Sequence, residues 1–359
     1  MIREKWDNKY NFKSIFNTKT GFYLRTGVID ESGHDTGVDP FMASFPELID
    51  IGIMGHCIHG LTGKCKESGV QCYQHGDVSH NLHMTFEDYR SIIDECKGKT
   101  FQVALGGCGD PDQHPDFEKI LAYTVDNDIV PNFTTSGFGL TEDKIKLCKQ
   151  YCGAVAVSWY RSKYTIEAVK NLVDAGIITN IHYVIGDNTI DEAIKLLETN
   201  GFPNGINAVI FLLHKPVGLG QSSNVLSKDD ERVAKFFKLI DTKKFQFKIG
   251  FDSCTIPGIL TFMKNVDKTS IDTCEAARWS MYITSDMKGL PCSFDNQEQR
   301  YAVDIKEAGS IQAVWDSEQF NQIRKKFECA CPDCKNRKNC LGGCPLMRGI
   351  QLCEAGNGG

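Results

Sequence analysis

The stretch LIDIGIMGHCIHGLTGKCKESGVQCYQHG, residues 48–76, places a short apolar run directly before a loop with three cysteines. The run LIDIGIM has the length and composition of a buried β-strand. Cys57, Cys65 and Cys72 follow it within one loop. In parallel α/β folds, the functional residues lie at the carboxyl ends of the strands. This stretch therefore predicts a functional loop at that end of a sheet.

Five further β-rich runs follow, with helix-like segments between them. The segments TEDKIKLCKQY (141–151) and TIEAVKNLVDAG (165–176) carry apolar residues at helical spacing, each with a threonine as N-cap candidate, and the second closes on a glycine. This alternation predicts an α/β fold, a partial (β/α)6 barrel of parallel strands related to the TIM barrel. The five runs are FQVALG (101–106), IVPNFTT (129–135), AVAVSW (154–159), TNIHYVI (179–185) and INAVIFLL (206–213).

The alternation ends near residue 215. HKPVGLGQSSN (214–224) is a loop by its Pro, Gly and Ser content, and DDERVAKFFKLID (229–241) reads as a helix. We therefore expect an N-terminal extension (1–47), the barrel (48–215), a linker and helix (216–253), a cysteine-rich domain (254–353) and a disordered tail (354–359).

Cysteine is the most informative residue type in this chain of 359 residues. No signal peptide and no run of about 18 apolar residues is present, so we expect a cytoplasmic protein without a membrane partner. In a reducing compartment, 16 cysteines indicate metal binding rather than disulfides. The net charge of −6 argues against a nucleic-acid partner.

The second predicted strand runs into GGCGDP, residues 106–111, where glycines permit a close backbone approach at a strand end. Three thiolates in the preceding loop suit an iron cluster with one open iron. The same loop would be a structural zinc site if a histidine completed it, and the candidates are His56, His59 and His75.

Together, the cysteine loop and the GGCGDP turn resemble the radical S-adenosylmethionine (SAM) superfamily, whose signature is three cysteines after the first strand and a GGEP-like turn after the second. The usual C-x3-C-x2-C spacing is enlarged here to seven and six intervening residues. Cys148 and Cys152 form a competing C-x3-C pair that lacks a third cysteine nearby. The resemblance implies a 4Fe-4S cluster on Cys57, Cys65 and Cys72 that binds SAM. It further implies SAM contacts from Tyr73, Gly106, Gly107, Cys108, Gly109, Asp110 and Pro111, with Ser136 and Ser158 as further candidates.

The C-terminal cysteines resemble the SPASM domain, which carries two auxiliary 4Fe-4S clusters in that superfamily. The resemblance implies one cluster on Cys254, Cys274, Cys292 and Cys344, where Cys254 is chosen over Cys329 as the upstream ligand. It implies a second cluster on Cys331, Cys334, Cys340 and Cys353. From the spacing alone, the same tail could also form zinc knuckles.

The resemblance implies an enzyme that generates a 5'-deoxyadenosyl radical and takes a hydrogen atom from a ribosomal precursor peptide, forming a thioether or carbon-carbon crosslink. A reduced flavodoxin or ferredoxin would supply the electron. An anaerobic sulfatase-maturing enzyme is the alternative within the superfamily, and a non-enzymatic zinc or iron-sulfur protein is the alternative from another class. The sequence identifies no catalytic acid or base.

Overall fold

The structure is a computed structural model that describes residues 1–76 and 81–354. The predicted α/β fold is confirmed: in these residues ten strands form one sheet in the order β10-β9-β8-β7-β6-β5-β4-β11-β12-β13. All six predicted strands are present, and each pairs in parallel with the next. They are β4 (Leu48–Met54), β5 (Gln102–Gly107), β6 (Val130–Thr135), β7 (Val155–Ser158), β8 (Thr179–Ile185) and β9 (Ala208–Leu213).

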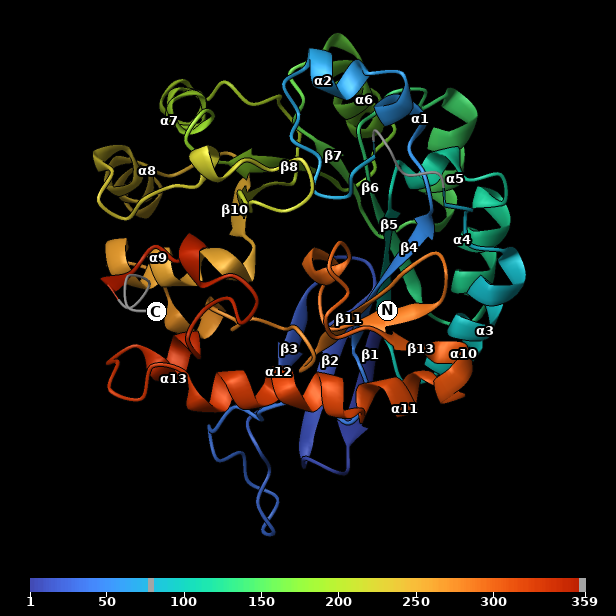
Figure 1. The fold of residues 1–359 in the computed structure, drawn as a ribbon, viewed down its shortest axis with the longest axis vertical. Helices are drawn as coiled ribbons and strands as arrows, with labels where there is room; N and C mark the ends of the chain where they lie inside the picture. The colour runs from blue at the N-terminus through green and yellow to red at the C-terminus, as the bar shows by residue number, and fades with distance from the viewer. Residues whose placement is uncertain (77–80, 355–359) are drawn as a thin grey trace.

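Six helices lie around the outside of this sheet (Figure 1). Each buries an apolar stripe against the strands, as Ile120 and Leu121 of α4 and Val169 and Leu172 of α6 show. The carboxyl ends of the strands are therefore left to loops. The helices are α3 (Phe86–Cys96), α4 (Phe117–Asp126), α5 (Glu142–Tyr151), α6 (Lys163–Asp174), α7 (Ile190–Thr199) and α8 (Glu231–Thr242).

The predicted caps hold for one of the two helices. Thr141 caps α5 by accepting the Lys144 N–H, as expected. The N-cap expected at Thr165 is wrong, because Ser162 accepts the Thr165 N–H and α6 begins earlier. The buried Thr165 hydroxyl instead donates to the Ser136 carbonyl at 3.1 Å and ties α6 to the loop after β6.

Residues after 215 extend the sheet at both edges. Strand β10 (Lys248–Phe251) pairs in parallel with β9, and β11 (Ser280–Ile283) pairs in parallel with β4. Strands β12 (Lys288–Leu290) and β13 (Val303–Asp304) continue that edge in antiparallel pairing. The C-terminal part of the chain thus packs directly beside the strand that precedes the cysteine loop.

The first residues form a small antiparallel sheet of β1 (Ile2–Asp7), β2 (Phe12–Asn17) and β3 (Tyr23–Arg25). Phe16 packs against Phe101 with ring centroids 5.5 Å apart, just before β5 begins. A cavity of about 320 Å³ separates this small sheet from the amino-terminal halves of β5 to β8. The small sheet therefore lies at the end of the strands opposite the cysteine loop.

The helices after α8 belong to the cysteine-rich part of the chain. Phe320, Ile323 and Phe327 form the buried stripe of α12, and Trp315 donates from Nε1 to the Ala43 carbonyl at 3.0 Å. The chain from 305 onward is thereby fixed to the segment before β4. These helices are α9 (Ile256–Phe262), α10 (Ile305–Ala308), α11 (Ile311–Trp315), α12 (Glu318–Cys329) and α13 (Arg337–Cys340).

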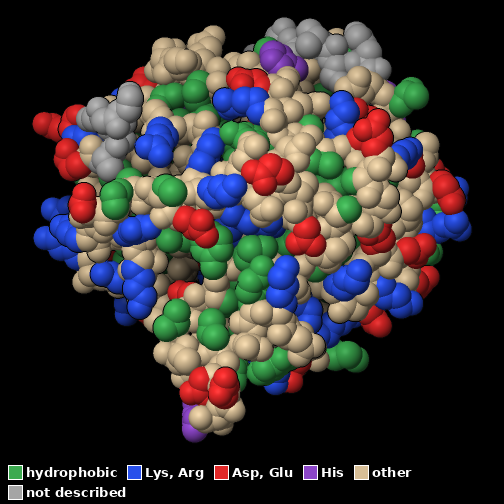
Figure 2. Space-filling view, turned by 60° about the horizontal axis from the view of Figure 1, so that its bottom comes forward, with side chains coloured by type: hydrophobic (Ala, Val, Ile, Leu, Met, Phe, Trp, Pro, Cys, Tyr) green, Lys and Arg blue, Asp and Glu red, His purple; other side chains and the backbone are tan. Residues whose placement is uncertain are grey.

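Within residues 1–76 and 81–354, no helix has both the length and the apolar character needed to cross a membrane. Lys and Arg side chains are interspersed with Asp and Glu over the face seen in Figure 2. The tail predicted to be disordered falls, from residue 355 on, outside the described residues.

Candidate functional site

The three predicted cysteines of the loop after β4 lie together. Cys57 is the N-cap of the short helix α1 (Ile58–Leu61), and its Sγ accepts the Gly60 N–H at 3.2 Å. Cys65, on helix α2 (Lys64–Glu67), forms a hydrogen bond with Cys57, and Cys72 lies close enough to Cys65 to act on it electrostatically. The enlarged spacing of this sequence therefore does not keep the three thiols apart.

The environment of Cys57 favours a thiolate. The hydrogen bond with Cys65 lowers the pKa of Cys57 to about 6, supported by the Gly60 N–H and opposed by burial. The same hydrogen bond raises the pKa of Cys65, and burial and the charge of Cys57 raise it further. Because the thiolate is the form that binds metal, the lowered pKa of Cys57 makes this residue suitable as a metal ligand.

Two glycines allow the backbone to approach these thiols. A Cβ at Gly76 would lie 3.0 Å from the Cys57 Cβ and 3.6 Å from the Cys72 Sγ. At Gly109, where φ is +141°, a Cβ would lie 2.8 Å from the His56 carbonyl oxygen. Side chains at these positions would fill the space beside the thiols, so the site fits a compact group held at that place.

No three His, Cys, Asp or Glu side chains in the described part of the chain converge as ligands of a single metal ion. The thiolates of an iron-sulfur cluster bind different irons, so a cluster needs thiols around a shared space rather than at one point. The three thiols of the loop, with glycine backbone beside them, match that donor set.

The GGCGDP turn stands beside the cysteine loop. Gly107 has φ +109°, and a Cβ there would lie 2.5 Å from the Met54 carbonyl oxygen, whereas a Cβ at Gly106 would meet no atom within 4 Å. Cys108 is buried, and its Sγ donates to the Gln74 carbonyl at 3.2 Å. Pro111 begins a 3-10 turn that ends the loop. Gly106 therefore leaves open space beside its backbone at the end of β5.

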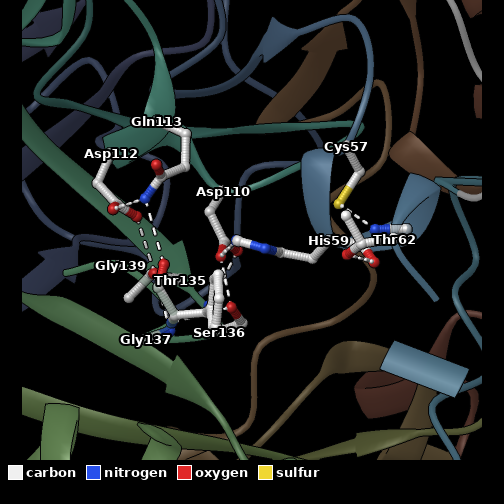
Figure 3. A network of polar contacts seen from close by, with 12 residues as sticks. Cys57, His59, Thr62, Asp110, Asp112, Gln113, Thr135, Ser136, Gly137 and Gly139 are labelled. Atoms are coloured by element: carbon white, nitrogen blue, oxygen red, sulfur yellow. Dashed lines mark hydrogen bonds and ion pairs between the residues drawn. The ribbon is translucent and has the colours of Figure 1, made fainter. Parts of the chain in front are cut away.

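Asp110 is held from two sides (Figure 3). The Ser136 N–H donates to Asp110 Oδ1 at 2.9 Å, and the Ser136 hydroxyl donates to Oδ2. His59 Nε2 lies 3.2 Å from Oδ2. Burial acts to lower the pKa of His59, but Asp110 together with Cys57 and Asp112 outweighs it, so the pKa is raised. The buried imidazole thus links the cysteine loop to the glycine-rich turn.

Asp112 connects the same turn to neighbouring elements through hydrogen bonds. It is buried, and it accepts hydrogen bonds from Thr135 at 2.8 Å, Gln113 at 2.6 Å and Lys144 at 3.2 Å. Burial and the nearby Asp110 raise its pKa against the effect of Lys144. The turn after β5 is therefore fixed to the loop after β6 and to α5.

The other two SAM-contact candidates are Ser158 and Tyr73. Ser158 is the last residue of β7, and its carbonyl accepts the Tyr160 N–H at 2.9 Å. The Tyr73 ring packs against Phe294 with centroids 4.8 Å apart. Tyr73 therefore connects the cysteine loop to the C-terminal part of the chain.

A second group of thiols, in the C-terminal part of the chain, contains the four cysteines predicted for the first auxiliary cluster. Cys254 forms a hydrogen bond with Cys344, and Cys274 lies within electrostatic range of Cys254 and Cys292. Burial raises the pKa of Cys292 to about 12. Cys329, the alternative upstream ligand, is exposed at the end of α12. The structure brings Cys254, and not Cys329, next to Cys344.

The four cysteines predicted for the second auxiliary cluster form a looser group. Burial, with smaller contributions from Cys353 and Cys331, raises the pKa of Cys340 to about 11. The Cys334 N–H donates to the Cys331 carbonyl at 3.1 Å in a tight turn. Cys331, Cys340 and Cys353 therefore lie near one another, with Cys334 beside Cys331 in the chain.

The competing pair lies elsewhere. Cys148 is buried on the inner face of α5, and Cys152 caps the same helix and is hydrogen-bonded to Cys148. Both pack against the core of the sheet. These cysteines are structural in this fold.

The chain shares its fold with solved structures of two proteins, SuiB and anSMEcpe. Two similar solved structures are those of SuiB from Streptococcus suis, one bound to S-adenosylmethionine and one to its precursor peptide SuiA. At 16% identity the first aligns over 84% of this chain and 74% of SuiB with a TM-score of 0.63, and the second over 84% and 72% with a TM-score of 0.64. A third is native anSMEcpe with bound AdoMet and the Cp18Cys peptide, at 16% identity, covering 86% of this chain and 91% of that one, with a TM-score of 0.57. No family model and no curated protein sequence matches the chain.

Proposed function

We propose that the chain is a radical SAM enzyme that modifies a peptide, with β4 to β9 as its partial barrel and residues 254–353 as a SPASM domain. The observation that carries the proposal is the gathering of Cys57, Cys65 and Cys72 beside the Asp110 turn, at the carboxyl ends of β4 and β5. The fold shared with proteins solved with S-adenosylmethionine supports it.

When bound, the cluster and SAM would supply one-electron chemistry: with an electron from a reduced flavodoxin or ferredoxin, SAM would be cleaved to methionine and a 5'-deoxyadenosyl radical able to take a hydrogen atom from the substrate. Cys57, Cys65 and Cys72 would hold the cluster. The open space beside the Gly106 backbone would admit the methionyl part of SAM. Asp110, fixed by Ser136, holds the turn that contains Gly106.

Space for a substrate lies beside this turn. A cavity of about 310 Å³ is bounded by Cys108 and Gln74 on the cysteine-loop side, and by Thr284 and Asp286 between β11 and β12. A peptide side chain that enters it reaches the end of β5. Because SuiB and anSMEcpe were both solved with peptides, a peptide is the substrate class we propose.

Mass spectrometry of treated peptides tests this function. The purified, anaerobically reconstituted enzyme is incubated with SAM, dithionite and two candidates, a short peptide encoded beside its gene and a cysteine peptide from a sulfatase. Loss of two hydrogen atoms from the first indicates a crosslink, and conversion of the cysteine thiol to an aldehyde indicates sulfatase maturation. No change in either peptide, together with no 5'-deoxyadenosine, would contradict peptide modification.

Replacement of Ser136 by Ala is expected to weaken SAM binding about two- to twelvefold. The variant loses one hydrogen bond to Asp110, about 0.5–1.5 kcal/mol, while the backbone N–H at 2.9 Å remains. Isothermal titration with SAM measures the change. Ser162→Ala is the matched control, since its hydroxyl caps α6 and does not contact Asp110. Equal affinities in Ser136→Ala and wild type would remove Asp110 from the proposed site.

A further inference from the structure

Lys215 is a buried cation at the end of β9. Its Nζ lies 2.5 Å from Asp252 Oδ2, donates to the Leu213 carbonyl at 2.8 Å, and stands 4.4 Å from the centroid of the Phe294 ring. The side chain is 1% exposed. A buried ammonium is costly unless it is paired, so a lysine here needs a reason beyond packing.

The contacts of Lys215 place its ammonium between two cysteine-bearing segments. Asp252 precedes Cys254 by two residues, and Phe294 follows Cys292 by two. The Asp252 carboxylate is fixed by the Leu213 N–H at 3.1 Å and by the Thr255 hydroxyl at 2.6 Å. The ion pair is therefore fixed between the segments that carry Cys254 and Cys292.

Within the pair, the ammonium has the stronger effect on the thiols. A hydrogen bond with Cys344 and burial raise the pKa of Cys254; Lys215 acts against this rise, and by more than Asp252 adds to it. Lys215 also acts to lower the pKa of Cys292, which burial raises. In turn, Cys254 and Cys344 are among the groups that raise the pKa of Lys215 against its burial. The positive end of the pair thus lies within electrostatic range of the thiols of Cys254, Cys292 and Cys344.

We propose that Lys215 raises the reduction potential of the auxiliary cluster held by Cys254, Cys274, Cys292 and Cys344, an inference that rests on the proposed function. Reduction adds one negative charge to a cluster already bound by four thiolates. A fixed cation in a site screened from water stabilises that added charge more than it would in solvent. The cluster becomes a better acceptor for an electron leaving the peptide after hydrogen-atom removal.

Redox titration followed by electron paramagnetic resonance tests this role in the anaerobically reconstituted full chain. The signal of this cluster is the one that Cys274→Ala abolishes. Lys215→Met is expected to shift its midpoint potential to more negative values, because the variant removes the cation and leaves Asp252. Lys215→Arg retains the charge and is expected to stay close to wild type.

Asp252→Asn is expected to shift the midpoint potential in the direction opposite to Lys215→Met. It leaves the cation without its carboxylate and is expected to shift the same potential to more positive values, a result that general misfolding does not produce. Unchanged potentials in both Lys215→Met and Asp252→Asn, in protein with full cluster content, would overturn the role of Lys215 alone. A wild-type chain that assembles no cluster on these cysteines would overturn the inference together with the proposed SPASM domain, whereas SAM cleavage would still report on the loop cluster.

Discussion

Cys72→Ala is expected to release no more 5'-deoxyadenosine from SAM than a reaction without enzyme, and to contain the iron of one cluster less than wild type. Cys72 is the third thiol of the loop and lies 3.6 Å from the position of a Cβ at Gly76, beside Cys57. With only two thiolates, the loop cannot hold a four-iron cluster with one open iron. Chromatography of the nucleoside and an iron assay measure the two losses.

Cys152→Ala is the matched control, because Cys152 belongs to the other C-x3-C pair of the chain and caps α5. This variant is expected to keep the iron content and nucleoside release of wild type. If Cys152→Ala lost the activity and Cys72→Ala kept it, the enlarged loop would not be the site of the cluster.

Gly107→Ala is expected to lower the free energy of unfolding by about 2–4 kcal/mol. The positive φ of +109° is strained for alanine, at about 1–3 kcal/mol, and the added Cβ would lie 2.5 Å from the Met54 carbonyl oxygen. To relieve the overlap between this Cβ and the Met54 carbonyl oxygen, β4 and β5 must move apart at their carboxyl ends, beside the site. Urea unfolding of the metal-free chain, followed by circular dichroism, measures the change.

At the neighbouring residue, Gly106→Ala is expected to change the affinity for SAM while leaving the free energy of unfolding nearly unchanged. A Cβ at Gly106 meets no protein atom within 4 Å, so its cost in stability is expected to stay below about 1 kcal/mol. If SAM occupies the open space beside Gly106, its affinity in the reconstituted enzyme falls about tenfold, equivalent to about 1.4 kcal/mol. A Gly106→Ala variant that binds SAM as wild type does would place SAM away from Gly106.

The strands of the main sheet could be predicted from the sequence because parallel strands are buried on both faces and read as apolar runs, as LIDIGIM shows. Strand β11 was not predicted. It has only four residues, and it pairs with β4, more than 200 positions earlier in the chain, so nothing in its local pattern indicates the partner. The N-cap of α6 was misplaced because Ser162 and Thr165 are both capping residue types and only the backbone shows which one is used.

Some residues of the candidate site could likewise be predicted from the sequence, and others could not. The cysteines and the GGCGDP turn could be predicted because their residue types are rare and ordered along the chain. The roles of Gly76 and His59 could not, since each depends on how the loop folds back: Gly76 onto two thiols and His59 onto Asp110. Similarly, the sequence suggests Lys215 only as a polar residue at a strand end. Its position near the thiols of Cys254, Cys292 and Cys344 follows from the contacts that Asp252 and Phe294 make with it just after β9.

One measurement tests the central claim most directly: 5'-deoxyadenosine release by the wild-type chain, purified without oxygen, reconstituted with iron and sulfide, and supplied with SAM, dithionite and the candidate peptides. The account predicts bound iron and sulfide, little zinc, and one methionine formed for each 5'-deoxyadenosine. Bound zinc in place of iron, or full iron loading without SAM cleavage under any of these conditions, would contradict it.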